Sequence, residues 1–200
     1  MKLTIKRIFD ICFASIALLF CSPIIVIIAL LIKTIDKGKV FYKQKRVGKN
    51  QKEFTIFKFK TMQVGSEKNG LLTIGNSDSR ITKVGYFLRK YKLDEIPQFF
   101  NVLLGNMSIV GPRPELQHYV NYYTKEDISV FNIKPGITSF ASIKFKNEVE
   151  LLKKASNPEA YYLNTILPEK LKLNKQYVAS HNLIVDLKII LQTFFALIKG

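Results

Sequence analysis

Residues 93–115 read LDEIPQFFNVLLGNMSIVGPRPE and combine two adjacent acids, an apolar run and a Gly-Pro-Arg-Pro turn. The apolar run predicts a helix that opens at residue 93 or 94 and ends near residue 104. Asp94 and Glu95 then lie at the helix start, where a carboxylate can cap the first turn and interact favourably with the helix dipole. Arg113 is held stiffly between two prolines. This segment therefore places two acids, a helix start and a rigid arginine close together in the chain.

The other segments alternate between strand patterns and helix patterns. The predicted elements are two strands within 39–62 joined by Gly48-Lys49-Asn50, a long loop at 63–80, short strands at 107–110 and 139–146, and helices at 82–91, 112–127, 147–155, 157–179 and 181–199. Together they predict an α+β fold, mostly helical, in one domain of residues 1–200.

The basic residues are concentrated near the N-terminus. The formal charge is +16, and residues 1–60 carry 13 Lys or Arg against 3 Asp or Glu. Such a region suggests nucleic acid, phosphate substrates or an anionic membrane surface as the partner. Cys12 and Cys21 have no metal-ligand spacing, so we expect them to be small buried hydrophobes in a chain that faces the cytoplasm.

A long apolar segment narrows the choice of partner. Residues 11–32 are 22 residues without a charge, about 33 Å of helix and nominally enough to cross a bilayer. Ser22-Pro23 lies at the midpoint, where proline frees a backbone carbonyl that the Ser22 hydroxyl can serve. Basic residues flank both ends, and the positive-inside rule places both flanks on the cytoplasmic side. We therefore expect a re-entrant membrane helix broken at Ser22 and Pro23, with a kinked span as the alternative.

The C-terminal segment is predicted to be an amphipathic helix. Lys188, Gln192 and Lys199 share one helical face, and an apolar face lies opposite. Such a helix lies on a core or in a membrane interface. Asp186 falls on the apolar side, so we expect a partner for it there, in either a buried salt bridge or a functional role.

The sequence lacks the motifs of several common enzyme classes. The chain has neither of the glycine-rich phosphate-cradle motifs, no Gly-x-Ser-x-Gly, and no Asp-x-Asp pair among its six Asp residues. His118 and His181 stand alone without metal-ligand spacing.

Two interpretations of the acid pair remain open. In the structural one, Asp94 is a helix N-cap and Glu95 favours the dipole. In the functional one, the nearby Arg80, Arg89 and Arg113 depress the pKa of Asp94 and keep it ionised as a carboxylate nucleophile. Glu95 would then hold a divalent cation together with phosphate oxygens, which suits Mg²⁺. That set of groups predicts a phosphoryl-transfer site.

The chain resembles the bacterial monotopic phosphoglycosyl transferases, which are polyprenyl-phosphate sugar-1-phosphate transferases. The resemblance covers nearly the whole chain in order, and it is most specific from residue 78 to residue 115. It is carried by KRIFD before the segment broken at SP, and then by VFYKQKRVG, FTIFKFKTM, DSRITKVGYFLRKYKLDEIPQFFNVLLGNMSIVGPRPEL, KPGIT and DLKIIL.

The resemblance implies an activity and a set of site residues. It implies transfer of a sugar 1-phosphate from a UDP-sugar to undecaprenyl phosphate, with release of UMP, by a ping-pong mechanism in which Asp94 is the nucleophile. Glu95 matches the metal-associated acid, so Asp94 and Glu95 are the candidate catalytic residues and Mg²⁺ ligands. Other matching positions are Arg89 and Arg113 for phosphate and Asp186 near the C-terminus.

The resemblance also implies a location and an organisation. It implies a monotopic protein of the bacterial inner membrane with its active site on the cytoplasmic face, in contact with membrane lipids. Residues 1–37 would form the re-entrant helix, residues 38–180 the cytoplasmic catalytic part, and residues 181–200 the amphipathic helix. A homodimer is left open, and no nucleic acid is expected.

The chain departs from the family pattern at several positions. Lys60 stands where many members have Arg, Asn106 where many have Asp, and PGITSFAS where PGITG is more common. A phosphate-binding Arg beyond that block is replaced by Lys144 or Lys146. We keep Arg80, Lys60 and Lys146 as further candidate phosphate-binding residues, and the identity of the sugar is what these changes put in doubt.

Two rival functions stay in view. A non-enzymatic basic protein could bind anionic lipid or nucleic acid through residues 33–60, where aromatic side chains are interleaved with cations. A soluble-type glycosyltransferase would release UDP, and the missing Asp-x-Asp disfavours it.

Overall fold

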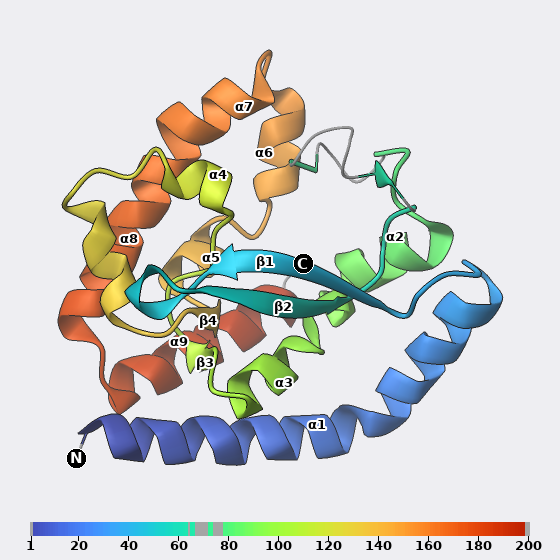
Figure 1. The fold of residues 1–200 in the computed structure, drawn as a ribbon, viewed down its shortest axis with the longest axis horizontal. Coiled ribbons are helices and arrows are strands. Elements are labelled where there is room, and N and C mark those ends of the chain that lie inside the picture. Colours follow the sequence, from blue (N-terminus) through green and yellow to red (C-terminus); the bar gives the residue numbers. More distant parts are fainter. Residues whose placement is uncertain (1, 64, 67–71, 74–77, 199–200) are drawn as a thin grey trace.

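The computed structural model describes residues 2–63, 65–66, 72–73 and 78–198, and it confirms a mostly helical α+β fold (Figure 1). The helices are α1 Lys2–Thr34, α2 Lys83–Lys90, α3 Gln98–Leu103, α4 Gln117–Val120, α5 Phe140–Lys144, α6 Glu148–Lys154, α7 Pro158–Tyr161, α8 Leu167–Ser180 and α9 Leu183–Ile198. The strands are β1 Phe41–Val47, β2 Glu53–Phe59, β3 Ser108–Val110 and β4 Gly136–Thr138. The 3₁₀ turns are η1 Lys49–Gln51, η3 Leu93–Glu95 and η4 Asp127–Asn132, and a π-helical turn, η5 Tyr162–Ile166, joins α7 to α8.

The strands form two small sheets. β1 and β2 pair antiparallel, with Phe41 opposite Phe59, as the sequence predicted for residues 39–62. β3 pairs in parallel with β4. The predicted loop at 63–80 falls partly on residues 64, 67–71 and 74–77, which lie outside the described residues.

Two predicted elements were wrong. Residues 112–127 hold only the four-residue α4, because the Pro112–Pro114 turn and the contacts of Glu115 with β1 take up the first part of the segment. Residues 139–146 form helix α5 rather than a strand. The Ser139 hydroxyl accepts the backbone N–H of Ser142 and so begins a helix. The strand in this region is instead β4, which lies just before α5.

Helix α1 bends where the sequence predicted a break. The helix runs through Pro23 without interruption, and its direction changes partway along (Figure 1). The Ser22 hydroxyl donates to the carbonyl of Leu19 at 2.8 Å, and this is the carbonyl that lacks a donor because Pro23 has no N–H. The prediction for the Ser22 hydroxyl is therefore confirmed, and the break is a bend within one helix.

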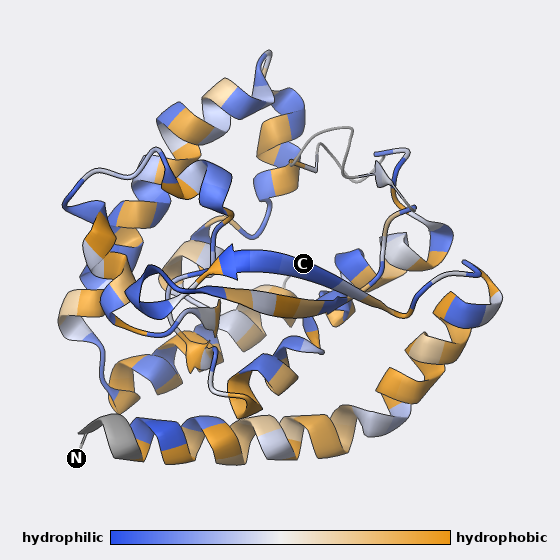
Figure 2. Ribbon diagram, viewed as in Figure 1, coloured by the Kyte–Doolittle hydropathy of each residue, from blue (hydrophilic) through white to orange (hydrophobic). Residues whose placement is uncertain are grey.

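Much of the surface of α1 is apolar and uncovered. One stretch, Ile5–Thr34, is long and apolar enough to cross a membrane, and Leu19 and Phe20 are 72% and 77% exposed. Cys12 is exposed and Cys21 is only partly buried, so the expectation of two buried cysteines was wrong. Figure 2 shows the apolar character of α1 along most of its length.

Three hydrophobic clusters form the core. One lies around Val47, Tyr162 and α8, and another contains Ala14, Val102 and Ile189 and so joins α1, α3 and α9. The third joins the second half of α1, through Ile28 and Ile32, to β2 and α2. The candidate catalytic residues lie in η3, directly before α3 and next to the third cluster, which includes Leu93 and Ile96.

Candidate active site

The acid pair sits in a 3₁₀ turn that opens from a left-handed residue. Lys92 has φ +57°, a conformation uncommon for a residue with a side chain, and η3 follows it. Neither η3 nor α3 receives a capping hydrogen bond from a side chain. The interpretation of Asp94 as an N-cap is therefore wrong, and its position needs another explanation.

Glu95 is held by two cations. Its Oε1 lies 2.7 Å from Nζ of Lys58 and 2.6 Å from Nη2 of Arg113, while Oε2 lies 3.4 Å from Nη1 of Arg113. Burial alone would raise the pKa of Glu95, but Arg113 and Lys58 outweigh it and hold that pKa well below its usual range. Glu95 is therefore ionised, and it fixes both cations beside Asp94.

Asp94 is nearly buried, and its carboxylate has no hydrogen-bond partner within the described part of the chain. Its residue surface is 7% exposed. Burial is the largest influence and raises the pKa of Asp94, Lys58 opposes this, and the charge of Glu95 adds to it. The expectation of a depressed pKa was therefore wrong in direction, because burial exceeds the effect of the nearby cations. Its oxygens are not among the fully buried polar atoms that lack a partner in the described chain, so a cation or an electrophilic phosphorus can still approach the carboxylate.

Arg89 reaches the same place from α2. Its Nε donates to Thr61 Oγ1 at 2.9 Å and its Nη1 to Thr73 Oγ1 at 3.1 Å. Burial lowers the pKa of Arg89, and the carboxylate of Asp94 is the largest opposing influence. The structure therefore brings Arg89, Asp94, Glu95 and Arg113 into one charged group, as the sequence predicted.

Three other predicted phosphate ligands make contacts with groups other than the acid pair. Arg80 binds Asp78 through Nε and Nη2 and the carbonyl of Leu72 at 2.7 Å. The ammonium of Lys60 packs against Gly38, near the end of α1. Lys146 contacts the carbonyl of Ala196 at 3.3 Å, near the end of α9.

Lys144, the alternative to Lys146, pairs with Glu169 at 2.6 Å. The contacts named for these four residues are all with groups other than Asp94 and Glu95.

Arg113 is positioned by a close approach of two glycines. A Cβ on Gly136 would lie 2.0 Å from the backbone N of Gly111, so only glycine fits. The Gly136 N–H donates to the Pro112 carbonyl at 2.9 Å and fixes the turn next to Arg113. Gly136, in the KPGIT segment, thus helps to position Arg113, in the GPRP segment, although the two lie far apart in the sequence.

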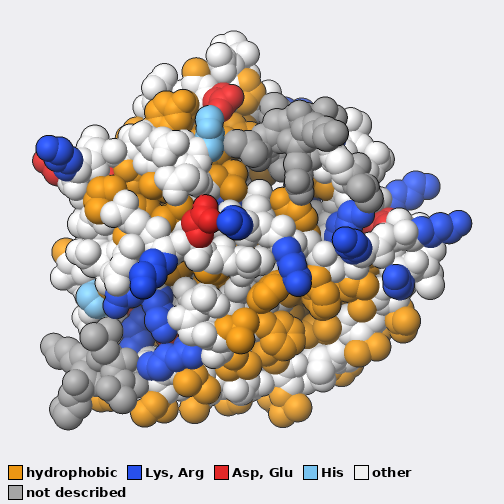
Figure 3. Space-filling model, in the orientation of Figure 1, with side chains coloured by type: hydrophobic (Ala, Val, Ile, Leu, Met, Phe, Trp, Pro, Cys, Tyr) orange, Lys and Arg blue, Asp and Glu red, His pale blue; other side chains and the backbone are white. Residues whose placement is uncertain are grey.

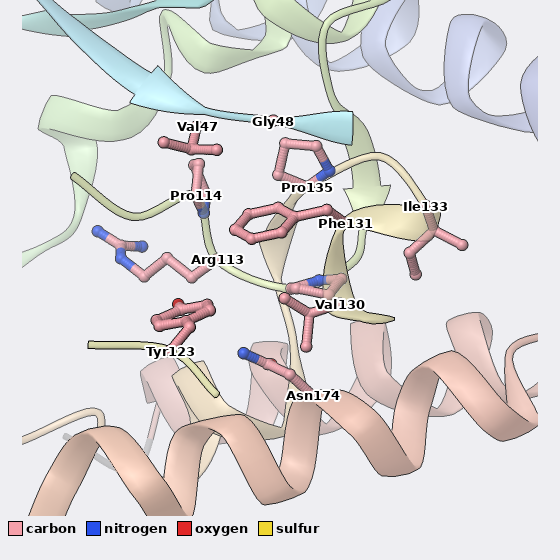
Figure 4. A pocket seen from close by; sticks show the side chains of 11 residues that line it. Val47, Gly48, Arg113, Pro114, Tyr123, Val130, Phe131, Ile133, Pro135 and Asn174 are labelled. Carbon is pink, nitrogen blue, oxygen red and sulfur yellow. The ribbon is translucent and has the colours of Figure 1, made fainter. Parts of the chain in front are cut away.

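A small pocket surrounds the stem of Arg113. Val47, Pro114, Phe131 and Asn174 are among the residues that line it. In Figure 4 the guanidinium of Arg113 points away from Phe131. Asp94 and Glu95 do not line this pocket, so it belongs to the packing that supports the arginine.

Asp186 is fully buried and partnered, as its sequence position indicated. It lies 2.5 Å from Nζ of Lys6 and accepts the hydroxyl of Tyr177 at 2.5 Å. These contacts join α9 to α1 and α8. The structure therefore places Asp186 in a buried salt bridge, one of the two roles considered for it.

Lys58 is the site residue that the sequence reasoning missed. It lies on β2 on the same face as Phe54 and Ile56, which pack into the core. A lysine continuing an apolar strand face predicts a buried charge with a partner, and this signal was present in EFTIFKF.

The acidic oxygens fit Mg²⁺ only in combination with substrate phosphates. Among the described residues, no group of three or more His, Cys, Asp or Glu side chains is placed to hold a metal ion. One or two carboxylates plus phosphate oxygens are a common Mg²⁺ site. Asp94 offers a carboxylate without a hydrogen-bond partner in the described chain, whereas Oε1 of Glu95 already binds Lys58 and Arg113.

Together, a bent apolar helix and a cation-lined carboxylate pair define a protein suited to phosphate chemistry beside a membrane. The model of the bacterial sugar transferase family matches residues 1–200. The chain belongs to that family.

Relatives with assigned names support this membership. The chain is 36% identical over 198 residues, 97% of its length, to a UDP-glucose:undecaprenyl-phosphate glucose-1-phosphate transferase of Klebsiella pneumoniae, of which it covers 40%. It is 42% identical over 142 residues to a UDP-N-acetylgalactosamine-undecaprenyl-phosphate N-acetylgalactosaminephosphotransferase of Aeromonas hydrophila, and here the match covers 70% of the chain and 34% of the relative.

A third relative is of similar size to this chain. It is the uncharacterized sugar transferase EpsL of Bacillus subtilis, 36% identical over 190 residues, with 94% of the chain and 85% of the relative covered. The chain thus spans well under half of the first two relatives and most of the third.

Proposed function

We propose that this protein transfers a sugar 1-phosphate from a UDP-sugar to undecaprenyl phosphate and so starts a lipid-linked glycan. The observation that carries the proposal is Asp94, a nearly buried carboxylate without a hydrogen-bond partner in the described chain, beside Glu95 held by Lys58 and Arg113. The activities named for the Klebsiella and Aeromonas relatives support the donor and acceptor classes.

The proposed chemistry runs through Asp94 in two displacements. A carboxylate oxygen of Asp94 attacks the phosphorus that bears the sugar, and the bond from that phosphorus to the oxygen of UMP breaks. A phosphate oxygen of the lipid then attacks the same phosphorus, the bond to Asp94 breaks, and the carboxylate is regenerated. Arg89 and Arg113 offset the charge on the phosphates.

Asp94 and Glu95 would hold Mg²⁺, which would neutralise phosphate charge. The positive charges of Lys58 and Arg89 favour the ionised form of Asp94 that the first step needs. Because Asp94 is nearly buried, its ionised form is less strongly solvated than a surface carboxylate and so more reactive; the same burial raises its pKa.

The proposed location is the inner membrane, with the site on the cytoplasmic face. The bend at Pro23 and the basic flanks of α1 favour a helix that enters and leaves by the same leaflet. The lipid acceptor and the soluble donor would then meet at the membrane surface.

One experiment tests the chemistry directly. The purified protein is incubated with a UDP-sugar and Mg²⁺ without acceptor, digested, and the peptides are weighed. We expect the Asp94 peptide to gain the mass of a sugar phosphate and UMP to appear in equal amount. If Asp94 stays unmodified in protein that turns over fully once undecaprenyl phosphate is added, the covalent step is refuted, and release of UDP would indicate a different transferase class.

A panel of UDP-sugars identifies the donor in the same assay. UMP release that depends on undecaprenyl phosphate separates a transferase from a non-enzymatic binding protein. No release with any donor would favour the binding protein.

A further inference from the structure

A second group of cations lies at the opposite end of α3 from the acid pair. Arg7, in α1, donates to the carbonyls of Val102 and Leu103 at 2.6 and 2.9 Å, in the last turn of α3. Asp94 precedes the first turn of the same helix. This group is therefore separate from the candidate active site.

Lys134 converges on the same place as Arg7. A Cβ built on Gly105 would lie 3.5 Å from Nη2 of Arg7 and 3.6 Å from Nζ of Lys134, so both charges face one small volume. The charge of Lys49, in the turn between β1 and β2, also acts on Lys134. Two separate segments thus bring Arg7 and Lys134 together, and Lys49 adds a third positive charge that acts on Lys134.

The cluster lacks an ion-paired acid among the residues that the structure describes. Within the described part of the chain, no ion pair is made by Arg7, Lys49 or Lys134. Asp10 is the acid whose charge acts on Lys134, but its Oδ1 already accepts the Ser108 hydroxyl and the Ile109 N–H, each at 3.0 Å. Burial and the neighbouring cations lower the pKa of Lys134. An anion would relieve the repulsion.

The surroundings point to an anion that belongs to the membrane. Ile5 and Ile8, on either side of Arg7 in α1, are 50% and 58% exposed. Figure 3 shows basic side chains gathered between the β1–β2 turn and the start of α1, with apolar side chains along the edge below them. A charged cluster next to an apolar helix surface is the arrangement that an anionic headgroup meets at an interface.

We propose that Arg7 and Lys134, with the charge of Lys49 nearby, bind the phosphate group of an anionic phospholipid. Two of the five N–H donors of Arg7 bond the α3 carbonyls, so the others remain for phosphate oxygens. The lysines add charge without being tied to other side chains in the described chain. Bound lipid would tie together α1, the β1–β2 turn and the segment before β4.

Native mass spectrometry of the detergent-purified chain tests this proposal without using turnover. The fraction of protein carrying one lipid is measured against the concentration of phosphatidylglycerol, with phosphatidylcholine as the neutral comparison. We expect tighter binding of phosphatidylglycerol, and Lys134→Gln should weaken it about fivefold. Lys134→Arg keeps the charge and should bind like the unaltered protein.

Lys125→Gln is the matched control. Lys125 is exposed, and the substitution removes the same charge at a position outside the cluster. Equal losses in Lys134→Gln and Lys125→Gln would overturn the proposal, since binding would then follow net charge alone. Competition by inorganic phosphate at the lipid's own concentration would also overturn it, because the site would then take free phosphate. Circular dichroism checks that each variant is folded.

Discussion

Asp94 and Glu95 are neighbours in the chain, but their environments shift their pKa values in opposite directions. Burial raises the pKa of Asp94, whereas Lys58 and Arg113 hold the pKa of Glu95 low. A raised folded-state pKa means that the ionised carboxylate costs stability at neutral pH. A depressed folded-state pKa, as at Glu95, means that ionisation contributes stability. That stability is lost as the pH falls through the folded-state pKa.

The adjacent acids therefore predict opposite stability effects for the same kind of substitution. Asp94→Asn removes a buried charge and should raise the unfolding temperature at pH 7, while turnover falls by at least about 10⁴-fold. Glu95→Gln leaves Lys58 and Arg113 without their counter-ion and should destabilise by about 2 kcal/mol. Thermal unfolding by circular dichroism, with UMP release in parallel, measures both. Two shifts of the same sign would contradict the assigned environments.

Lys58 offers a test through the pH dependence of turnover. Its positive charge favours the ionised form of Asp94, so Lys58→Met should raise the pKa of Asp94 further. The acid limb of the rate profile should move to higher pH by about one unit. Lys58→Arg is the control that keeps the charge. An unchanged acid limb in the Met variant would show that Asp94 does not limit the rate there.

At the scale of elements, one buried acid adds an ionic contact to the apolar packing that holds α9 on the fold. Asp186 meets Lys6 of α1 and Tyr177 of α8, and it contacts neither member of the acid pair. We predict that Asp186→Asn destabilises the protein by about 2 kcal/mol, because Lys6 loses its counter-ion. Turnover of the folded fraction at low temperature should stay within about threefold.

The double variant with Lys6→Met distinguishes a structural role from a chemical one. It removes both members of the pair and should be less destabilised than Asp186→Asn alone. A folded Asp186→Asn protein with negligible turnover would instead assign this acid to the reaction.

The bend in α1 makes the topology testable. In a chain with Cys12 and Cys21 changed to Ser, Lys2→Cys should be inaccessible to a membrane-impermeant thiol reagent outside intact cells. Adding Pro23→Ala restores the missing backbone donor and favours a straight helix, so labelling from outside should rise. Strong labelling without the Pro23 change would establish a kinked span in place of a re-entrant helix.

At the scale of the whole molecule, apolar and basic surfaces lie side by side. The exposed apolar residues of α1 are joined by others on α9, such as Ile184 and Leu191, which are 81% and 58% exposed. Hydrophobic burial is insensitive to salt, whereas binding through surface charge weakens as salt rises.

We therefore predict that 1 M NaCl leaves the protein on the membrane and that detergent releases it. Centrifugation of washed membranes, followed by detection of the protein in pellet and supernatant, measures this. A peripheral basic protein treated in parallel should leave with salt. Release of this chain by salt alone would favour the non-enzymatic interpretation.

The sequence by itself determined the features that depend on neighbours in the chain. The β1–β2 hairpin, helices α2 and α9, the apolar α1 and the acid pair followed from local pattern and turn chemistry. The bend at Pro23 also followed, because a missing N–H acts on the carbonyl four residues earlier. Family resemblance in the sequence added the candidate roles of the arginines.

Only the tertiary structure decided what distant residues do to one another. Local alternation at residues 139–146 favoured a strand, but the strand forms at β4, because Gly111 and Gly136 let it approach β3. Lys58 met Glu95, and Asp94 acquired a raised pKa, because burial and charge are set by segments brought together in space. Desolvation depends on everything packed around a group, and no short stretch of sequence contains that information.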